Sequence, residues 1–226
     1  SSKEALEPFT IKTFKVAESK IFNSIIPNLW EYLETFGDVS SLAHYAGVDI
    51  GILLKGTQKE IDTKKKELIA YFDKSALKKN IYHYGNESLE QVIVSLALSK
   101  KVTFGFAESC TGGLNSSRIT DIGGCSAVYM GSVTSYSNEI KQSILGVDST
   151  TLELHGAVSE KTAVEMAIGA REKLNIDIAI STTGIAGPSG GSKEKPVGTV
   201  AIGIATKNES SAKIFNYTGD RESLKL

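Results

Sequence analysis

The sequence is poor in the residues that build disulfides and metal sites. It has two cysteines, Cys110 and Cys125, and three dispersed histidines, His44, His83 and His155. Two cysteines cannot form the disulfide framework of a small secreted domain. Because there is no Cys/His cluster, a zinc site has little support, and we expect no metal and no cofactor. Cys110 adjoins a glycine-rich motif, where a reactive thiol is one interpretation and a small buried neighbour is the other.

An excess of one charge and long apolar runs are also missing. The formal net charge is −1, whereas a general nucleic-acid-binding protein carries a strong basic excess. No stretch approaches the ~18 consecutive apolar residues of a membrane helix, and the first residues are not a signal peptide. We therefore expect a cytoplasmic protein with no membrane or nucleic-acid partner. Because the chain begins Ser-Ser-Lys without Met, we also expect a piece of a longer protein.

Glycine is scarce in the first part of the chain. Residues 1–84 hold 4 of the 21 glycines and contain no arginine. Their patterns predict strands at 10–16, 39–45, 48–54 and 80–84, and helices at 18–36 and 59–77. This βαββαβ order predicts a small α+β domain over residues 1–84, with helices on one face of a largely antiparallel sheet.

A run of three lysines at 64–66 raises the question of RNA binding by this domain. Acidic residues, Asp62 and Glu67, flank the run, and such mixed charge favours a solvated helix face. The domain also lacks the G-x-x-G loop of KH domains that clamp RNA. Its residues alone do not identify a function.

Residues 85–226 hold the other 17 glycines and alternate strands with helices. We expect strands at 102–107, 127–136, 176–182, 198–205 and 213–217, and helices at 88–99, 111–121, 137–145 and 159–174. This alternation predicts an α/β domain of three layers, in which helices cover both faces of a mainly parallel sheet. The last two strands are expected to pair.

The first candidate motif, at 107–113, reads Ala-Glu-Ser-Cys-Thr-Gly-Gly and joins a predicted strand to a predicted helix. Ligands bind beyond the carboxyl ends of strands in open α/β sheets, and a helix N-terminus offers unpaired N–H groups to an anion. Ser109 is therefore a candidate nucleophile, with Thr111, Gly112 and Gly113 as candidate substrate-binding residues. The motif is neither a nucleophile elbow nor a P-loop. The alternative is that Ser109 or Thr111 only caps the helix.

The second motif, at 135–141, reads Ser-Tyr-Ser-Asn-Glu-Ile-Lys and follows another predicted strand. A hydroxyl needs a base to attack an amide, and no histidine is near either motif in the sequence. Lysine can serve when burial or a neighbouring positive charge lowers its pKa, which makes Lys141 the candidate base. The alternative is an exposed helix lysine. Tyr136 is five residues away and need not share a helix face with Lys141.

The third motif is a glycine-rich loop that follows a third predicted strand. It has five glycines between residues 184 and 198. Glycines let backbone N–H groups approach a ligand closely, and a lysine in such a loop can neutralise a phosphate. A flexible lid without a ligand is the alternative. Three unusual loops at three strand ends of one sheet predict a common site.

At these motifs the sequence resembles the C-terminal domain of the CinA family, the competence-damage-inducible proteins. The matching strings are AESCTGG at 107–113, SYSNEIK at 135–141, LGV at 145–147, HGAVSE at 155–160, TTGIAGPSGG at 182–191 and EKPVGTV at 194–200. The departures, Ser132 for a common glycine and Lys193 for a common proline, lie beside the motifs. Residues 1–84 resemble the KH-type middle domain of full-length CinA proteins, in which a further N-terminal domain precedes it.

The resemblance implies an enzyme that hydrolyses the carboxamide of nicotinamide mononucleotide to nicotinic acid mononucleotide and ammonia, without a metal. Carried over by position, Ser109 resembles the nucleophile, Lys141 its base and Tyr136 a neighbouring hydroxyl. The alternative is a non-catalytic nucleotide-binding or scaffolding protein of the same fold.

The resemblance also implies that the glycine-rich loop cradles the substrate. Thr183, Gly184 and Gly187 resemble parts of that cradle, and we assign Lys195 to the phosphate of the nucleotide. By family analogy we expect a homodimer, since closed twofold dimers are the commonest oligomers.

Overall fold

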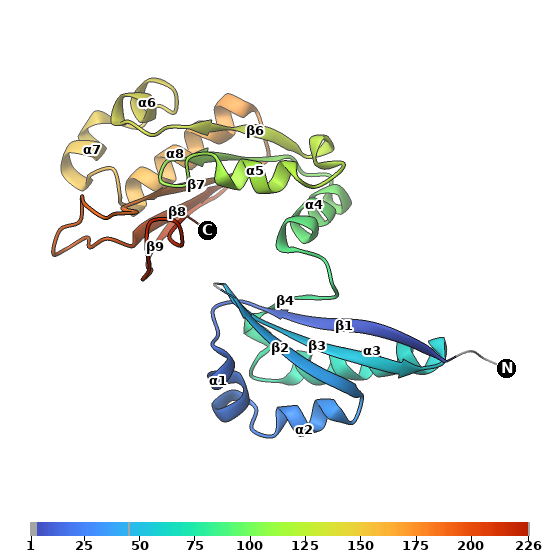
Figure 1. Ribbon diagram of the computed structural model, residues 1–226. Helices are drawn as coiled ribbons and strands as arrows, with labels where there is room; N and C mark the ends of the chain where they lie inside the picture. The colour runs from blue at the N-terminus through green and yellow to red at the C-terminus, as the bar shows by residue number, and fades with distance from the viewer. Residues whose placement is uncertain (1–3, 45, 226) are drawn as a thin grey trace. The chain divides into compact units, whose positions relative to one another are not determined.

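The computed structural model describes residues 4–44 and 46–225. Tyr45, the last residue of the strand predicted at 39–45, lies outside the described residues, as do residues 1–3 and 226. The chain divides into two compact units, Ser1–Ser88 and Leu89–Leu226 (Figure 1). None of the described helices is long and apolar enough to cross a bilayer.

The first unit has the predicted βαββαβ order. Its elements are β1 (Ala5–Thr13), α1 (Glu18–Lys20), the π-helical turn η1 (Ile21–Ile25), α2 (Leu29–Glu34), β2 (Gly37–His44), β3 (Gly47–Gly56), α3 (Gln58–Lys74), the 3₁₀ turn η2 (Lys78–Asn80) and β4 (Ile81–Tyr84). The sheet has the order β2-β3-β1-β4, and every neighbouring pair is antiparallel.

The segment at 18–36 is not the single helix that its apolar periodicity predicts. It is divided into α1, η1 and α2, and Pro27 and Asn28 separate the last two. Proline has no N–H for a helical hydrogen bond, and Asn28 has a left-handed backbone with φ of 63°. The apolar stripe still packs inward, because Ile21, Leu29 and Leu33 are buried. The apolar residues of the segment are therefore buried although the predicted continuous helix does not form.

One face of the first sheet forms the core of this unit. Phe9 and Ile11 alternate with more exposed residues along β1, and they pack with Ile50 of β3 and with Leu68 and Phe72 of α3. Apolar residues recur every second position on the strand and every third or fourth position on the helix. Each set therefore lies on one face of its element, and the two faces pack into one apolar layer.

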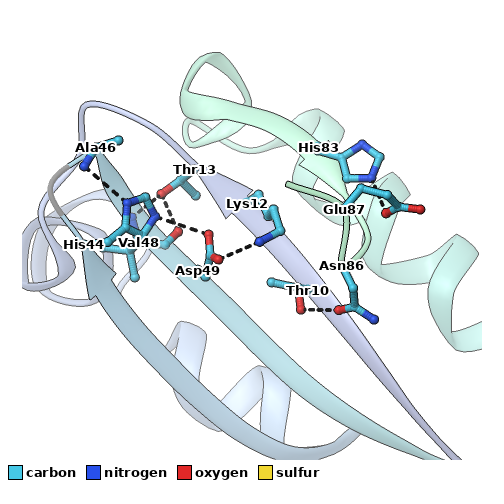
Figure 2. Close-up of polar contacts among 10 residues, drawn as sticks. All are labelled: Thr10, Lys12, Thr13, His44, Ala46, Val48, Asp49, His83, Asn86 and Glu87. Carbon is cyan, nitrogen blue, oxygen red and sulfur yellow. Dashed lines mark hydrogen bonds and ion pairs between the residues drawn. The ribbon is translucent and has the colours of Figure 1, made fainter. Parts of the chain in front are cut away.

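The other face of the first sheet carries polar side chains that pair with one another (Figure 2). Lys12 Nζ lies 2.7 Å from Asp49 Oδ2, and His44 Nε2 lies 3.3 Å from Asp49 Oδ1. Near the end of the unit, Thr10 Oγ1 donates to Asn86 Oδ1 at 2.8 Å. The charges on this face are therefore balanced locally by neighbouring strands.

The second unit alternates helices and strands. Its elements are α4 (Leu89–Lys100), β5 (Phe104–Glu108), α5 (Leu114–Thr120), the 3₁₀ turn η3 (Cys125–Ala127), β6 (Tyr129–Thr134), α6 (Asn138–Ser143), α7 (Ser149–His155), α8 (Glu160–Leu174), β7 (Ile178–Gly184), β8 (Thr199–Ala205) and β9 (Ser210–Asn216). The short helix α7, which Asp148 caps through its side chain, is absent from the sequence prediction.

The sheet of this unit is mixed and has the order β6-β5-β7-β8-β9. The strands β6, β5 and β7 are parallel, as the βαβ alternation predicts. The final pair, β8 and β9, joins antiparallel. After β5 the chain forms β6 on one side of β5 and then β7 on the other side of β5. The strand order therefore reverses at β5. Ligand sites in open sheets lie at such a point, beyond the carboxyl ends of the strands.

Helices cover both faces of this sheet, which makes three layers (Figure 1). The side chains of β5 alternate between two apolar clusters, one on each face of the sheet. Phe104 and Phe106 belong to one apolar cluster with Val94 of α4 and Ile119 of α5. Ala107 belongs to a second cluster that includes residues of α7 and α8. Neighbouring side chains of a strand point to opposite faces, so β5 contributes to both cores.

Candidate active site

The three predicted motifs meet at one edge of the second sheet. Because β5, β6 and β7 are parallel, their carboxyl ends lie side by side. The loops that follow them are joined by main-chain hydrogen bonds. Ser109 N donates to Thr182 O at 2.9 Å, and Ser135 N donates to Glu108 O at 2.7 Å. The three loops therefore lie together, at the edge where the sequence predicts a common site.

Lys141 points into the protein toward Ser109. It lies on α6, whose first turn is capped by the Ser137 hydroxyl, and only 1% of its surface is exposed. Its Nζ lies 2.9 Å from Ser109 Oγ, 2.7 Å from the Ser135 carbonyl oxygen and 3.5 Å from that of Tyr136. The interpretation of Lys141 as an exposed helix lysine is therefore wrong.

Burial makes the neutral form of Lys141 accessible near neutral pH. Loss of hydration lowers the pKa of the Lys141 ammonium from 10.5 to about 8, and Cys110 opposes this shift. A neutral amine has two N–H donors and one lone pair, and the two carbonyls of Ser135 and Tyr136 accept those donors. The lone pair then faces the Ser109 hydroxyl, so this geometry lets Lys141 accept the Ser109 proton.

Ser109 and Lys141, which we call the dyad, line a cavity of about 160 Å³. Besides Ser109 and Lys141, residues from the other motifs and from the end of the chain line it: Tyr136, Ala157, Val158, Thr183, Gly184 and Arg221. Cavities for drug-sized ligands are roughly 300 Å³ or larger. This one is therefore sized for the reacting end of a substrate.

Cys110 also adjoins the cavity, but its environment does not activate the thiol. Burial raises the pKa of the Cys110 thiol, which keeps it in the unreactive protonated form. A Cβ atom at Gly184 would lie 3.1 Å from Cys110 Sγ and 2.9 Å from a Val200 methyl group. Gly184 is thus required for close packing against Cys110, and the packed-neighbour interpretation fits this contact.

The backbone N–H groups of Gly112 and Gly113, which the sequence assigns to the substrate, are engaged within the chain. Gly112 N donates to Ser109 O at 3.1 Å, and Gly113 N donates to the Glu108 carboxylate at 3.1 Å. Thr111 Oγ1 pairs with Thr182 Oγ1 at 2.9 Å. The residue that precedes α5 is Gly113, without a side-chain cap. Neither Ser109 nor Thr111 is therefore the helix cap.

The glycine-rich loop is brought to the cavity only in part. Thr183 and Gly184 line it, and Thr183 Oγ1 donates to Ala157 O at 2.8 Å. Gly187 contributes its carbonyl oxygen to Arg221. Lys195 instead donates to the His155 carbonyl at 2.6 Å. Because His155 is the last residue of α7, the Lys195 charge lies at the negative end of that helix.

Arg221 is a cavity residue that the sequence analysis missed. Its guanidinium donates to Gly187 O at 2.9 Å and to the Tyr136 hydroxyl at 3.1 Å. Tyr136 is 63% exposed, and this contact orients its ring beside the site. The available signal was the rarity of the residue, since the chain has only three arginines, Arg118, Arg171 and Arg221.

Comparison with known proteins agrees with the strand-end motifs. The model of the CinA C-terminal domain matches residues 86–226. The chain belongs to the CinA family. A CinA-like protein from Chlorobaculum tepidum is 39% identical over 222 residues, which cover 96% of this chain and 52% of that protein. A second CinA-like protein, from Prochlorococcus marinus, is 52% identical over 151 residues, 66% of this chain and 35% of that protein.

Solved CinA structures resemble one part of the chain. The crystal structure of the competence/damage inducible protein CihA from Agrobacterium tumefaciens is 38% identical, with a TM-score of 0.59. The match covers 61% of this chain and 84% of that one. The chain spans about half the length of the CinA-like protein from Chlorobaculum tepidum.

Proposed function

We propose that this CinA protein hydrolyses the carboxamide of nicotinamide mononucleotide, with Ser109 as nucleophile and Lys141 as base. The observation that carries the proposal is the pair itself. Lys141 Nζ lies 2.9 Å from Ser109 Oγ, and Lys141 is buried with a pKa lowered to about 8. A hydroxyl next to a neutral buried amine is the arrangement that serine–lysine hydrolases need.

Two half-reactions account for the products. In the first, Ser109 Oγ attacks the carboxamide carbon while its proton passes to Lys141 Nζ. Lys141 then gives that proton to the departing nitrogen, so ammonia leaves and an acyl-ester remains on Ser109. In the second, water attacks the ester carbon, and Lys141 takes a proton from the water and returns it to Ser109 Oγ. The product leaves as the carboxylic acid, which loses its remaining proton to solvent and becomes the carboxylate. Neither half-reaction requires a metal.

The phosphate of the substrate is best placed near Arg221. Arg221 lines the catalytic cavity and also a neighbouring cavity of about 490 Å³, together with Leu114, Glu222 and Lys225. A guanidinium matches the oxygens of a phosphate in charge and geometry. Since Arg221 lines the cavity of Ser109 and Lys141 and Lys195 does not, we transfer the expected phosphate contact from Lys195 to Arg221.

Release of ammonia tests the proposal. We expect the protein to convert nicotinamide mononucleotide in the presence of EDTA, and Ser109→Ala to bind the nucleotide without converting it. Mass spectrometry identifies the product as nicotinic acid mononucleotide. Stable binding of unchanged nucleotide by the wild-type protein would instead support the non-catalytic alternative.

We further propose that the Ser1–Ser88 unit is a KH-type domain without an RNA-binding role, and that the protein is a homodimer. The βαββαβ order supports the first assignment. Lys64 Nζ donates to Lys55 O at 2.8 Å, and Lys65 Nζ pairs with Glu7, so these lysines are engaged locally. Filter binding at low salt tests RNA affinity, and sedimentation equilibrium tests the dimer.

A further inference from the structure

Glu108 is a fully buried carboxylate that holds the loop of the nucleophile. It ends β5, directly before Ser109, and none of its surface is exposed. Its Oε2 accepts from the N–H groups of Gly113 and Asn115, both at 3.1 Å. Its Oε1 accepts from Ser116 N at 3.0 Å and from the Ser116 hydroxyl. Each carboxylate oxygen therefore receives two donors.

These bonds close the chain from 109 to 113 into a loop that is held at both ends. At its start, Ser109 N donates to Thr182 O at 2.9 Å. At its end, Gly113 N returns to the side chain of Glu108. Gly112 and Gly113 have φ of 62° and 99°, and these left-handed residues let so short a segment turn back. The position of Ser109 Oγ depends on this closure.

The main chain of Glu108 also contacts the loop that carries the acceptors of Lys141. Glu108 O accepts from Ser135 N at 2.7 Å, and Ser135 O accepts from Lys141 Nζ at 2.7 Å. One residue thus connects the nucleophile loop to the lysine loop. Its side chain fixes the former and its carbonyl group fixes the latter.

We infer that Glu108 is a positioning residue, whose carboxylate occupies the N-terminus of α5 and thereby holds Ser109 against Lys141. This inference rests on the proposed amidase function for its effect on turnover. It also means that the amides of Gly113, Asn115 and Ser116 bind a carboxylate of the chain itself. The nucleotide phosphate therefore has to bind elsewhere.

The charge and the two equivalent oxygens of Glu108 are both needed. A carboxylate can accept all four donors, whereas a glutamine amide has one oxygen and an NH₂ group that only donates. In either orientation of a glutamine, two donors of the loop would face that NH₂ group. A negative charge is also favoured at a helix N-terminus. Glu108→Gln should therefore loosen the loop with little change of side-chain volume.

The test measures turnover and covalent labelling of Ser109 by methanesulfonyl fluoride in parallel. Labelling forms the Ser109 Oγ–sulfur bond, expels fluoride and passes the proton to Lys141, so it reports the dyad without the nucleotide. For Glu108→Gln we expect kcat and the labelling rate to fall by roughly 10²-fold, because small displacements of a reacting group cost that much. The KM for nicotinamide mononucleotide and the pH midpoint of the labelling rate should stay unchanged.

Asp177→Asn is the matched control, because Asp177 also accepts a backbone N–H and a hydroxyl, those of Thr103, before β7 and away from the site. It should lower thermal stability while leaving both rates unchanged. Equal rates for Glu108→Gln and wild type, or a shifted pH midpoint, would overturn the positioning role. Labelling of wild type at Ser109 without turnover would reject the proposed function only.

If Glu108→Gln does not fold, Ser116→Ala decides the question. It removes the hydroxyl donor to Glu108 and the contact of Ser116 Oγ with Ser132 Oγ, and it leaves the three backbone donors to Glu108 in place. It should slow labelling by roughly threefold to tenfold, in line with the net contribution of one ordinary hydrogen bond. An unchanged labelling rate in a folded Ser116→Ala protein would contradict the inference.

Discussion

A lysine acts as a base only in its neutral form, and at Lys141 burial provides that form. Because burial lowers the Lys141 pKa from 10.5 to about 8, the protonated, inactive form dominates below pH 8. We expect kcat to rise about tenfold per pH unit below that midpoint and to level off above it. A pH profile of kcat checks this. A midpoint near the ordinary lysine value would show that Lys141 is not the base.

Lys141→Arg should remove activity although it keeps the positive charge. Guanidinium stays protonated throughout the working pH range and cannot accept the Ser109 proton. We expect kcat to fall by about 10³-fold or more, as for other members of catalytic groups that act as a unit. The comparison of kcat with wild type over the same pH range measures the loss. Substantial activity in the arginine variant would assign the base to another group.

Ser109 and Lys141 should behave as one unit in a double-mutant cycle. Because the nucleophile and the base each act only when the other is present, the kcat of Ser109→Ala/Lys141→Ala should be hardly lower than that of either single variant. Cys110→Ala is the neighbouring control, and it should keep most of the activity, since burial raises the thiol pKa and keeps Cys110 protonated. Losses that multiply in the double variant, or loss only in Cys110→Ala, would move the nucleophile elsewhere.

The turn between β5 and α5 needs glycine at position 112 for its left-handed backbone conformation, and not because a side chain would clash there. A Cβ atom at Gly112 or at Gly123 would meet nothing within 4 Å, but only Gly112 has a left-handed φ, of 62°. Gly112→Ala should therefore cost about 1–2 kcal/mol of unfolding free energy and lower kcat by displacing Ser109. Gly123→Ala should do neither. Urea unfolding and kcat of the two variants test this, and equal effects would contradict it.

The elements also show which local patterns can be read without the structure. The periodicity at 18–36 correctly identified the buried face but not the break at Pro27, which a single proline in an apolar stripe could have indicated. At 111–121 the predicted helix begins too early. The observed helix is Leu114–Thr120, because two left-handed glycines delay its first turn. In both places backbone conformation overrides a correct side-chain pattern.

At the scale of the molecule, the residues proposed for catalysis all lie in the second unit. The solved CihA relative matches 61% of this chain over 84% of its own length, and the model of the CinA C-terminal domain matches residues 86–226. We expect a protein of residues 86–226 to fold cooperatively and to retain kcat within about twofold of the whole chain, since Ser109, Lys141 and the other residues that line their cavity all belong to Leu89–Leu226. Circular dichroism and the ammonia assay test this. Loss of kcat in a folded fragment would give the first unit a catalytic role.

The sequence by itself determined the order of the strands and of the helices, except for α7 and the break within 18–36, and it determined the three loops that meet at the ends of β5, β6 and β7. Alternating patterns identify parallel strands, and parallel strands place their carboxyl ends at one edge, so Ser109, Lys141 and Thr183 could be assigned to one region. These inferences need only windows of neighbouring residues, and the family motifs strengthen them because they fall in the same loops.

Only the tertiary structure decided what each side chain does there. Whether Lys141 is exposed or buried depends on how α6 packs, and its contact with Ser109 spans 32 residues of chain. The contact between Arg221 and Tyr136 spans 85 residues. Of the N–H groups that look available for a ligand in sequence, that of Gly112 donates to Ser109 O and that of Gly113 donates to the Glu108 carboxylate. Burial, and with it the pKa of Lys141, is a property of packing between distant segments, which no local window contains.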